Sequence, residues 1–426
     1  MVSAPIIGLA FAIALQVQPT VKLGGQPVRV SLSDLLLPVA ILYEIACFWD
    51  RQVLPPPSLM VWPALFLAVF FISFRKSAPH EGYPGGWAKT KLTGAAVLGL
   101  YFLAGAGLAQ LDSDGARRSF AIGLASGSLV LVVLYVVLKA AKSPAIRLLS
   151  FETARFAGLN ANPNAGCLTL ALALGLALAS RGAVDQMLPN WADIAVCGIL
   201  LLGILLTEST SGILASATIL LLLLMLGFAT PARVAAIVAT GTALYAAICG
   251  FDEDRRFYAT IQIYKMMYVF GISRYSSGQF FTEAKERAQV RSLGPRSSTM
   301  AQAIGLWKRA PVFGHGLGAF LKLQEREQGP QAKLIQIHNT YLWLLYETGL
   351  AGVALFLLFL AFIALQLWQS LGIASTADHP PAAAFAAAAL AFLAGWCVMS
   401  VANEMMYQRI AWFAMGLAMP IQSAAA

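Results

Sequence analysis

The sequence predicts an all-α protein that crosses a membrane about twelve times and has one large, partly helical loop. Only 12% of its 426 residues are charged and 59% are apolar, whereas soluble domains average about 25% charged residues. Apolar runs of roughly 17–25 residues recur along the chain, and each is long enough to cross the bilayer hydrocarbon as a helix. The low charge and the repeated runs therefore exclude a soluble globular protein.

Each predicted span is an apolar run bounded by polar, glycine or proline residues. The runs are 4–18, 31–49, 58–74, 92–110, 119–138, 164–180, 192–207, 212–229, 232–250, 338–370, 381–402 and 406–423. No basic segment precedes the first run, so we expect it to remain as an anchor rather than to act as a cleaved signal peptide. The alanine-rich stretch 382–391 predicts close helix packing through small residues.

The longest connection divides the chain. We expect a transmembrane bundle of about nine spans over 1–250, a periplasmic loop with amphipathic helices over 251–337, and a further bundle of about three spans over 338–426. The loop contains thirteen basic and seven acidic residues. It therefore supplies most of the net charge of +9.

One amphipathic helix is predicted within this loop, over 297–310. Its apolar positions Met300, Ile304 and Trp307 recur at spacings of three and four, which suits a helix on the membrane surface or a cap on the bundle. A glycine-rich segment follows at 313–318 and predicts a flexible turn.

The charge distribution conflicts with the simplest topology. Twelve spans with a cytoplasmic N-terminus place 24 basic residues outside and five inside, opposite to the positive-inside rule. When only the short connections are counted, 11 basic residues lie outside and five lie inside. Either the orientation of the protein in the membrane is inverted, or the cations on the outside have a function. Phosphate binding is the simplest such function. Charge alone leaves both interpretations open.

The sequence predicts neither a metal site nor a cofactor. The five cysteines lie in or at the ends of apolar runs without metal-ligand spacing, so we expect them to be core residues. The one acidic cluster, 252–254, has adjacent carboxylates that point in different directions, and Arg255 and Arg256 follow it. We interpret this cluster as a solvated helix end.

His338 is the most informative single residue, because it stands where the polar loop re-enters an apolar helix. Its type and position alone are typical of an interfacial or helix-capping histidine. An imidazole that titrates near neutral pH also suits a general base, which contributes on the order of 10²–10⁴-fold to a rate. Glu347 lies about half a helical revolution from His338, so it cannot orient the imidazole from the same face.

Ordered motifs surround this histidine. Residues 311–320 (PVFGHGLGAF) match the pattern P-x-x-G-x-G-x-x-x-F, and residues 338–349 match H-N-x-x-L…E-x-G. Asn162-Pro163-Asn164-Ala165 and Thr207-x-Ser209 are weaker matches earlier in the chain. Together they resemble the O-antigen ligase and polymerase superfamily of bacterial inner-membrane glycosyltransferases, most closely its ligase branch. Many members have an arginine after that serine, where this chain has Thr210.

The resemblance implies transfer of a glycan from undecaprenyl diphosphate to a sugar hydroxyl of lipid A–core, in lipopolysaccharide biosynthesis. The reaction would be a metal-independent inverting displacement at the periplasmic side of the inner membrane. The alternatives within the superfamily are an O-antigen polymerase and a protein O-oligosaccharyltransferase. A transporter or flippase is more remote, because polar residues gather at helix ends rather than at paired mid-span positions. Neither nucleic acid nor an obligate protein partner is expected.

For this reaction His338 is the expected base, and cations are expected to bind the donor diphosphate, since the arginine fork matches phosphate oxygens. The candidate diphosphate ligands are Arg296, Lys265, Arg274, Arg147 and Arg155. The candidate substrate contacts are Asn339, Tyr341, His315, Asn162 and Asn164. The last two also suit a helix cap, and Tyr341 also suits a membrane interface.

Overall fold

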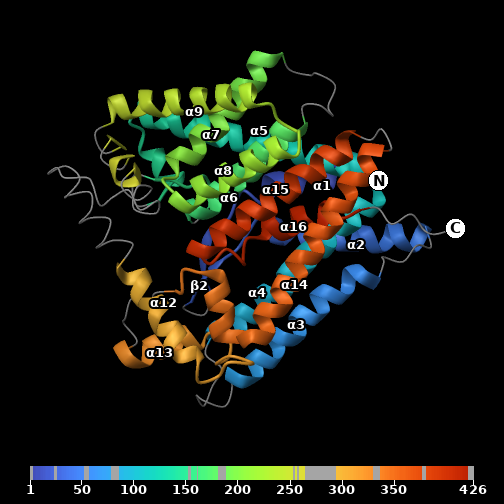
Figure 1. The fold of residues 1–426 in the computed structure, drawn as a ribbon, viewed down its shortest axis with the longest axis vertical. Helices are drawn as coiled ribbons and strands as arrows, with labels where there is room; N and C mark the ends of the chain where they lie inside the picture. The colour runs from blue at the N-terminus through green and yellow to red at the C-terminus, as the bar shows by residue number, and fades with distance from the viewer. Residues whose placement is uncertain are drawn as a thin grey trace.

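The computed structural model describes a helical bundle (Figure 1). The described residues are 3–23, 26–51, 57–77, 86–151, 155–160, 162–180, 189–252, 255–256, 259–263, 294–329, 336–376 and 380–420. The helices before the long loop are α1 (Ala4–Ala14), α2 (Ser33–Arg51), α3 (Pro57–Ser77), α4 (Gly86–Leu111), α5 (Ser113–Ala140), α6 (Pro163–Ser180), α7 (Asn190–Leu206), α8 (Thr210–Met225) and α9 (Pro231–Phe251). Those within and after it are α12 (Gly294–Trp307), α13 (Ala319–Gln328), α14 (Thr340–Thr376), α15 (Pro380–Ala402) and α16 (Arg409–Leu417).

The all-α, polytopic architecture is confirmed, but the count of about twelve spans is not. Each predicted apolar run contains a helix. Seven helices among the described residues are long and apolar enough to cross a membrane. Three more, α1, α7 and α8, are apolar but shorter. The chain also forms a short 3-10 helix, η1 (Pro144–Leu148), and two small antiparallel hairpins that the sequence did not predict, β1 (Thr20–Leu23) with β2 (Gln26–Arg29) and β3 (Ser150–Phe151) with β4 (Arg155–Phe156).

The centre of the bundle is formed by α6 and α15, which pack against α8. Within its span α6 is 83% buried, whereas α9 at the periphery is 11% buried. Small residues permit this close packing, as predicted for 382–391: the alanines at 383–389 are buried, and a Cβ added at Gly395 would lie 2.8 Å from the Ala215 carbonyl oxygen.

Successive helices run in opposite directions, so that one end of the bundle collects many polar helix ends. We define the His338 face as the end at which α6, α8 and α14 begin and α5, α7, α9 and α15 end. Hydrogen bonds join these ends directly, from Asn164 at the start of α6 to Asn403 after α15, and from Thr340 at the start of α14 to the same residue. Figure 1 shows α12 and α13 at this end.

The glycine-rich turn at 311–318 is docked onto α14 and is not the flexible connection that the sequence predicted. At Gly349 (φ +71°, ψ −168°) the helix is interrupted, so backbone groups on both sides lose their helical partners. The turn supplies replacements: the amides of His315 and Gly316 donate to the carbonyls at 346 and 347, and the amides at 350 and 351 donate to the carbonyls at 311 and 312.

The predicted amphipathic helix is α12, and of the two predicted positions the structure shows the cap on the bundle, because α12 packs against α14. It ends at Trp307, a little before the predicted end at 310. Its buried side includes Ala303, which is fully buried, while Ile304 is largely exposed. The buried stripe is therefore rotated slightly from the predicted one.

Replacing Gly349 by alanine should destabilise the protein by at least about 2 kcal/mol, because the residue has a left-handed φ and its Cβ would overlap the Val312 carbonyl. The matched control is Gly305→Ala in α12, where an added Cβ meets no atom within 4 Å and alanine favours a helix. Thermal unfolding in detergent provides the measurement. Equal losses in the two variants would contradict the docking role of Gly349.

Candidate functional site

His338 lies immediately before α14, and the chain on both sides of it is fixed. Ile337 on one side is 1% exposed. On the other side the Asn339 side chain accepts a hydrogen bond from the Leu342 amide at 2.8 Å, which is an N-cap interaction. The half-buried imidazole is therefore carried on a backbone segment with little freedom, at the edge of the His338 face.

Beneath His338 a network of side-chain hydrogen bonds links four helix ends. Buried Thr340 donates to the Asn403 carbonyl and accepts from the Met405 amide, both at 2.9 Å. The Asn403 amide donates to Ser211 at 2.6 Å and its side-chain oxygen accepts from Asn164 at 2.9 Å. Asn164 in turn accepts from Ser209 at 2.7 Å. We call the five residues Asn164, Ser209, Ser211, Thr340 and Asn403 the polar network.

The polar network brings together motif segments that are far apart in the sequence. Asn164 belongs to the first weak motif, Ser209 to the second, and Thr340 to the segment that begins with His338. Asn162 accepts a hydrogen bond from the Asn164 amide at 2.8 Å and so caps α6. Of this asparagine pair, Asn164 thus belongs to the polar network and Asn162 to the helix cap.

Two arginines hold the turn between α7 and α8. Arg155 donates to the carbonyls of Thr207 and Glu208 at 2.9 and 3.3 Å. Arg255 is 1% exposed and pairs with the Glu208 carboxylate at 2.8 Å, and it also donates to the Tyr135 hydroxyl. Glu208 has a left-handed φ of +53°, which is uncommon for a residue other than glycine. These contacts fix the turn that contributes Ser209 to the polar network.

The predicted cations do not form a single group in the described residues. Arg155 of β4 donates to the α7–α8 turn, whereas Arg147 is exposed on η1. Arg296 lies in α12, but its side chain is outside the described residues, as are Lys265 and Arg274 altogether. Thr210, where the resemblance led us to expect arginine, donates to the side chain of Gln262.

Two further candidate contacts have structural partners. The His315 ring forms a 2.8 Å hydrogen bond with the Leu306 carbonyl and stacks on Tyr346 with ring centroids 4.7 Å apart. The Tyr341 hydroxyl donates to the Cys397 carbonyl at 3.1 Å. His315 therefore joins the glycine-rich turn to α12 and α14, and Tyr341 joins α14 to α15.

A buried ion pair anchors α14 from its other side. Lys91 of α4 lies 2.8 Å from the Glu347 carboxylate, with side-chain exposures of 8% and 0%, and its ammonium sits 4.4 Å from the Trp343 ring. Glu347 thus has its charge balanced by Lys91 of α4. Its backbone carbonyl also accepts from Ser73 of α3 at 2.6 Å.

No group of three or more histidine, cysteine, aspartate or glutamate residues positioned to hold a metal ion occurs in the part of the chain that the structure describes. In the acidic cluster at 252–254, Asp252 pairs with Lys139 at 2.9 Å, and the two other residues lie outside the described ranges.

Sequence reasoning missed several residues that position the site, namely Lys91, Asn403, Ser211, Thr340, Glu208 and Arg255. One signal was available: Glu208 is an acidic residue in a short polar turn between two apolar helices. Such a charge needs a partner when it is buried. The identity of the partner required the fold.

Lys91→Met should destabilise the protein by about 3–5 kcal/mol, because it leaves the Glu347 carboxylate buried without its partner. The double variant Lys91→Met/Glu347→Met removes both charges and should recover most of that loss. Apparent melting temperatures of the two single variants and the double variant in detergent provide the test. A double variant as unstable as the sum of the single variants would show that the pair is not coupled.

Residues 195–357 match a family model described as O-Antigen ligase. The match spans the α7–α8 turn, the docked glycine-rich turn and the start of α14 that carries His338. No curated protein sequence matches the chain. The match covers less than half of the chain, so it shows that this segment is similar to the O-antigen ligase superfamily, and it does not distinguish the branches of that superfamily.

Proposed function

We propose that this protein is an O-antigen ligase, a glycosyltransferase that moves a glycan from undecaprenyl diphosphate to a sugar hydroxyl of lipid A–core. The observation that supports it most is the convergence of the family's motif segments on His338 through the polar network. A base for the acceptor hydroxyl needs a fixed position within hydrogen-bond reach of it. The capped start of α14 provides such a fixed position.

The attack requires a hydroxyl nucleophile and a diphosphate leaving group. In this proposal His338 takes the proton of the acceptor hydroxyl as its oxygen bonds to the anomeric carbon, and the bond from that carbon to the diphosphate oxygen breaks. Negative charge then develops on the diphosphate. Arginine stabilises such charge because it stays protonated and binds two oxygens at once.

Position 210 carries threonine instead of arginine. Among the arginines that the structure describes, Arg155 is the best placed to bind the diphosphate. It is half-buried, and from β4 it donates hydrogen bonds to the turn that contains Ser209. Arg255 is nearly fully buried, and its charge is balanced by Glu208, so it suits a positioning role.

The ligase branch is favoured by the charge of the His338 face. Its exposed cations include Lys76, Lys142, Arg147, Lys308 and Arg309. Lipid A–core is rich in phosphate and carboxylate, so it complements such a surface. We propose that this face is periplasmic and that the bundle spans the bacterial inner membrane, as the resemblance implies. Binding of lipid A–core should then weaken with rising salt.

His338→Ala should lower glycan transfer by on the order of 10²–10⁴-fold, as expected for removal of a general base. The assay uses purified protein, a lipid-diphosphate glycan and lipid A–core, with EDTA present. His315→Gln is the control for loss of an imidazole, because that ring binds a backbone carbonyl. Transfer at the wild-type rate by His338→Ala would remove the catalytic role.

The product of the same assay distinguishes the branches. A glycan attached to lipid A–core supports the ligase. A lengthened lipid-linked glycan without such a product would identify a polymerase, and transfer to a serine or threonine peptide would identify a protein O-oligosaccharyltransferase.

Arg155→Gln should raise the KM for the lipid-diphosphate donor by about tenfold or more, because a charge-assisted hydrogen bond to phosphate contributes about 1.5–3 kcal/mol. Arg155→Lys keeps the charge but loses the fork, so it should recover only part of the affinity. Arg147→Gln, which changes an exposed cation on η1, is the matched control. A smaller effect of Arg155→Gln than of Arg147→Gln would contradict this assignment.

A further inference from the structure

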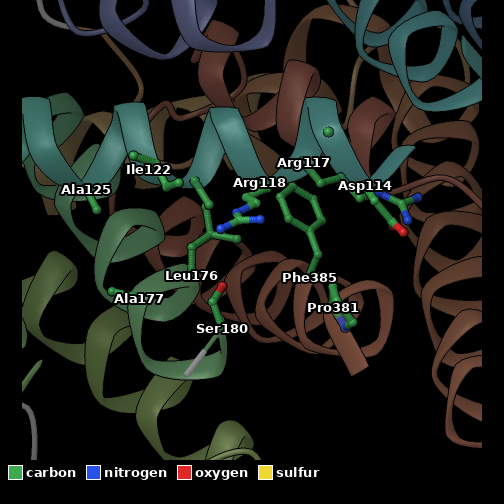
Figure 2. Close-up of a pocket in the computed structure, with 12 residues that line it drawn as sticks. Asp114, Arg117, Arg118, Ile122, Ala125, Leu176, Ala177, Ser180, Pro381 and Phe385 are labelled. Carbon is green, nitrogen blue, oxygen red and sulfur yellow. The ribbon is translucent and has the colours of Figure 1, made fainter. Parts of the chain in front are cut away.

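A cavity of about 340 Å³ lies at the end of the bundle opposite to the His338 face, where α5 begins and α6 ends (Figure 2). The start of α15 closes it with Phe385 and Pro381. The polar network and His338 do not contribute to its lining. It is therefore separate from the proposed glycosyl-transfer site.

The lining changes from polar to apolar along the direction of the spans. Arg118 and Ser180 stand at the ends of their helices, at the start of α5 and the end of α6. Ile122 and Ala125 lie one to two turns further into α5, and Leu176 lies one turn further into α6. A cavity with charge at the helix ends and apolar walls toward the middle of the spans matches the order of groups in a phospholipid.

The two arginines at the cavity differ in their surroundings. Arg117 is 7% exposed and donates to the carbonyls of Leu417 and Met419 at 2.9 and 2.7 Å, and Figure 2 shows the Asp114 carboxylate beside it. Arg117 therefore holds α5 to the end of α16. Arg118 is exposed, and Figure 2 shows its guanidinium and the Ser180 hydroxyl directed into the same space.

We propose that this cavity binds an anionic phospholipid. The headgroup phosphate accepts hydrogen bonds from the Arg118 guanidinium and the Ser180 hydroxyl. One acyl chain lies against Ile122, Ala125 and Leu176, and the small side chain at 125 leaves room for it. A free phosphate ion would use the polar end only, so the apolar wall selects the lipid. The proposal does not depend on the glycosyltransferase assignment.

The test measures binding of phosphatidylglycerol to the purified full-length protein in neutral detergent by native mass spectrometry. Arg118→Gln should weaken binding by about tenfold, since about 1.4 kcal/mol of phosphate contact corresponds to a factor of ten. Ala125→Phe fills the apolar part without changing charge and should also weaken binding. Arg75→Gln, an exposed arginine at the end of α3, is the control and should leave the affinity unchanged.

Three outcomes would overturn the proposal. The first is unchanged phosphatidylglycerol binding in Arg118→Gln, whose melting temperature without lipid reports that it is folded. The second is an equal loss in Arg75→Gln, which would indicate attraction to the basic surface in general. The third is inorganic phosphate displacing the lipid at an equal concentration, which would indicate a small-anion site.

Discussion

The candidate site depends on one constraint: helix ends buried in a bundle must find hydrogen-bond partners inside the protein. On the His338 face, the residues of the polar network meet this requirement by hydrogen bonding to one another. Each bond joins a different pair of chain segments, so the network fixes the relative positions of α6, α8, α14 and α15. His338 is placed by this arrangement because it lies two residues before Thr340.

The charges around this network are organised in pairs. Lys91 with Glu347 joins α4 to α14, Arg255 with Glu208 joins the end of α9 to the α7–α8 turn, and Arg409 with Asp34 joins α16 to α2 at 2.7 Å. A buried pair adds little net stability because both charges lose their hydration. Removing one partner is costly, however, so such pairs strongly oppose alternative helix registers. Their value here lies in fixing which helices meet.

The two ends of the bundle have different chemistry. The His338 face combines exposed cations with a satisfied polar network and a turn docked on a broken helix. The opposite end has a cavity with two arginines at helix ends and apolar walls below them. Under the two proposals made above, glycosyl transfer takes place at one end of the bundle and an anionic phospholipid binds at the other.

The sequence by itself determined the helical, membrane-spanning class, the position of almost every helix and the segments that carry the motifs, because hydropathy and glycine or proline placement are local properties. Only the tertiary structure decided that the turn at 311–318 docks on Gly349, that Arg155 and Arg255 both reach the α7–α8 turn, and that Asn403 completes the network. These pairings join residues up to 239 positions apart, as for Asn164 and Asn403, and no local pattern specifies which distant partner satisfies a buried polar group.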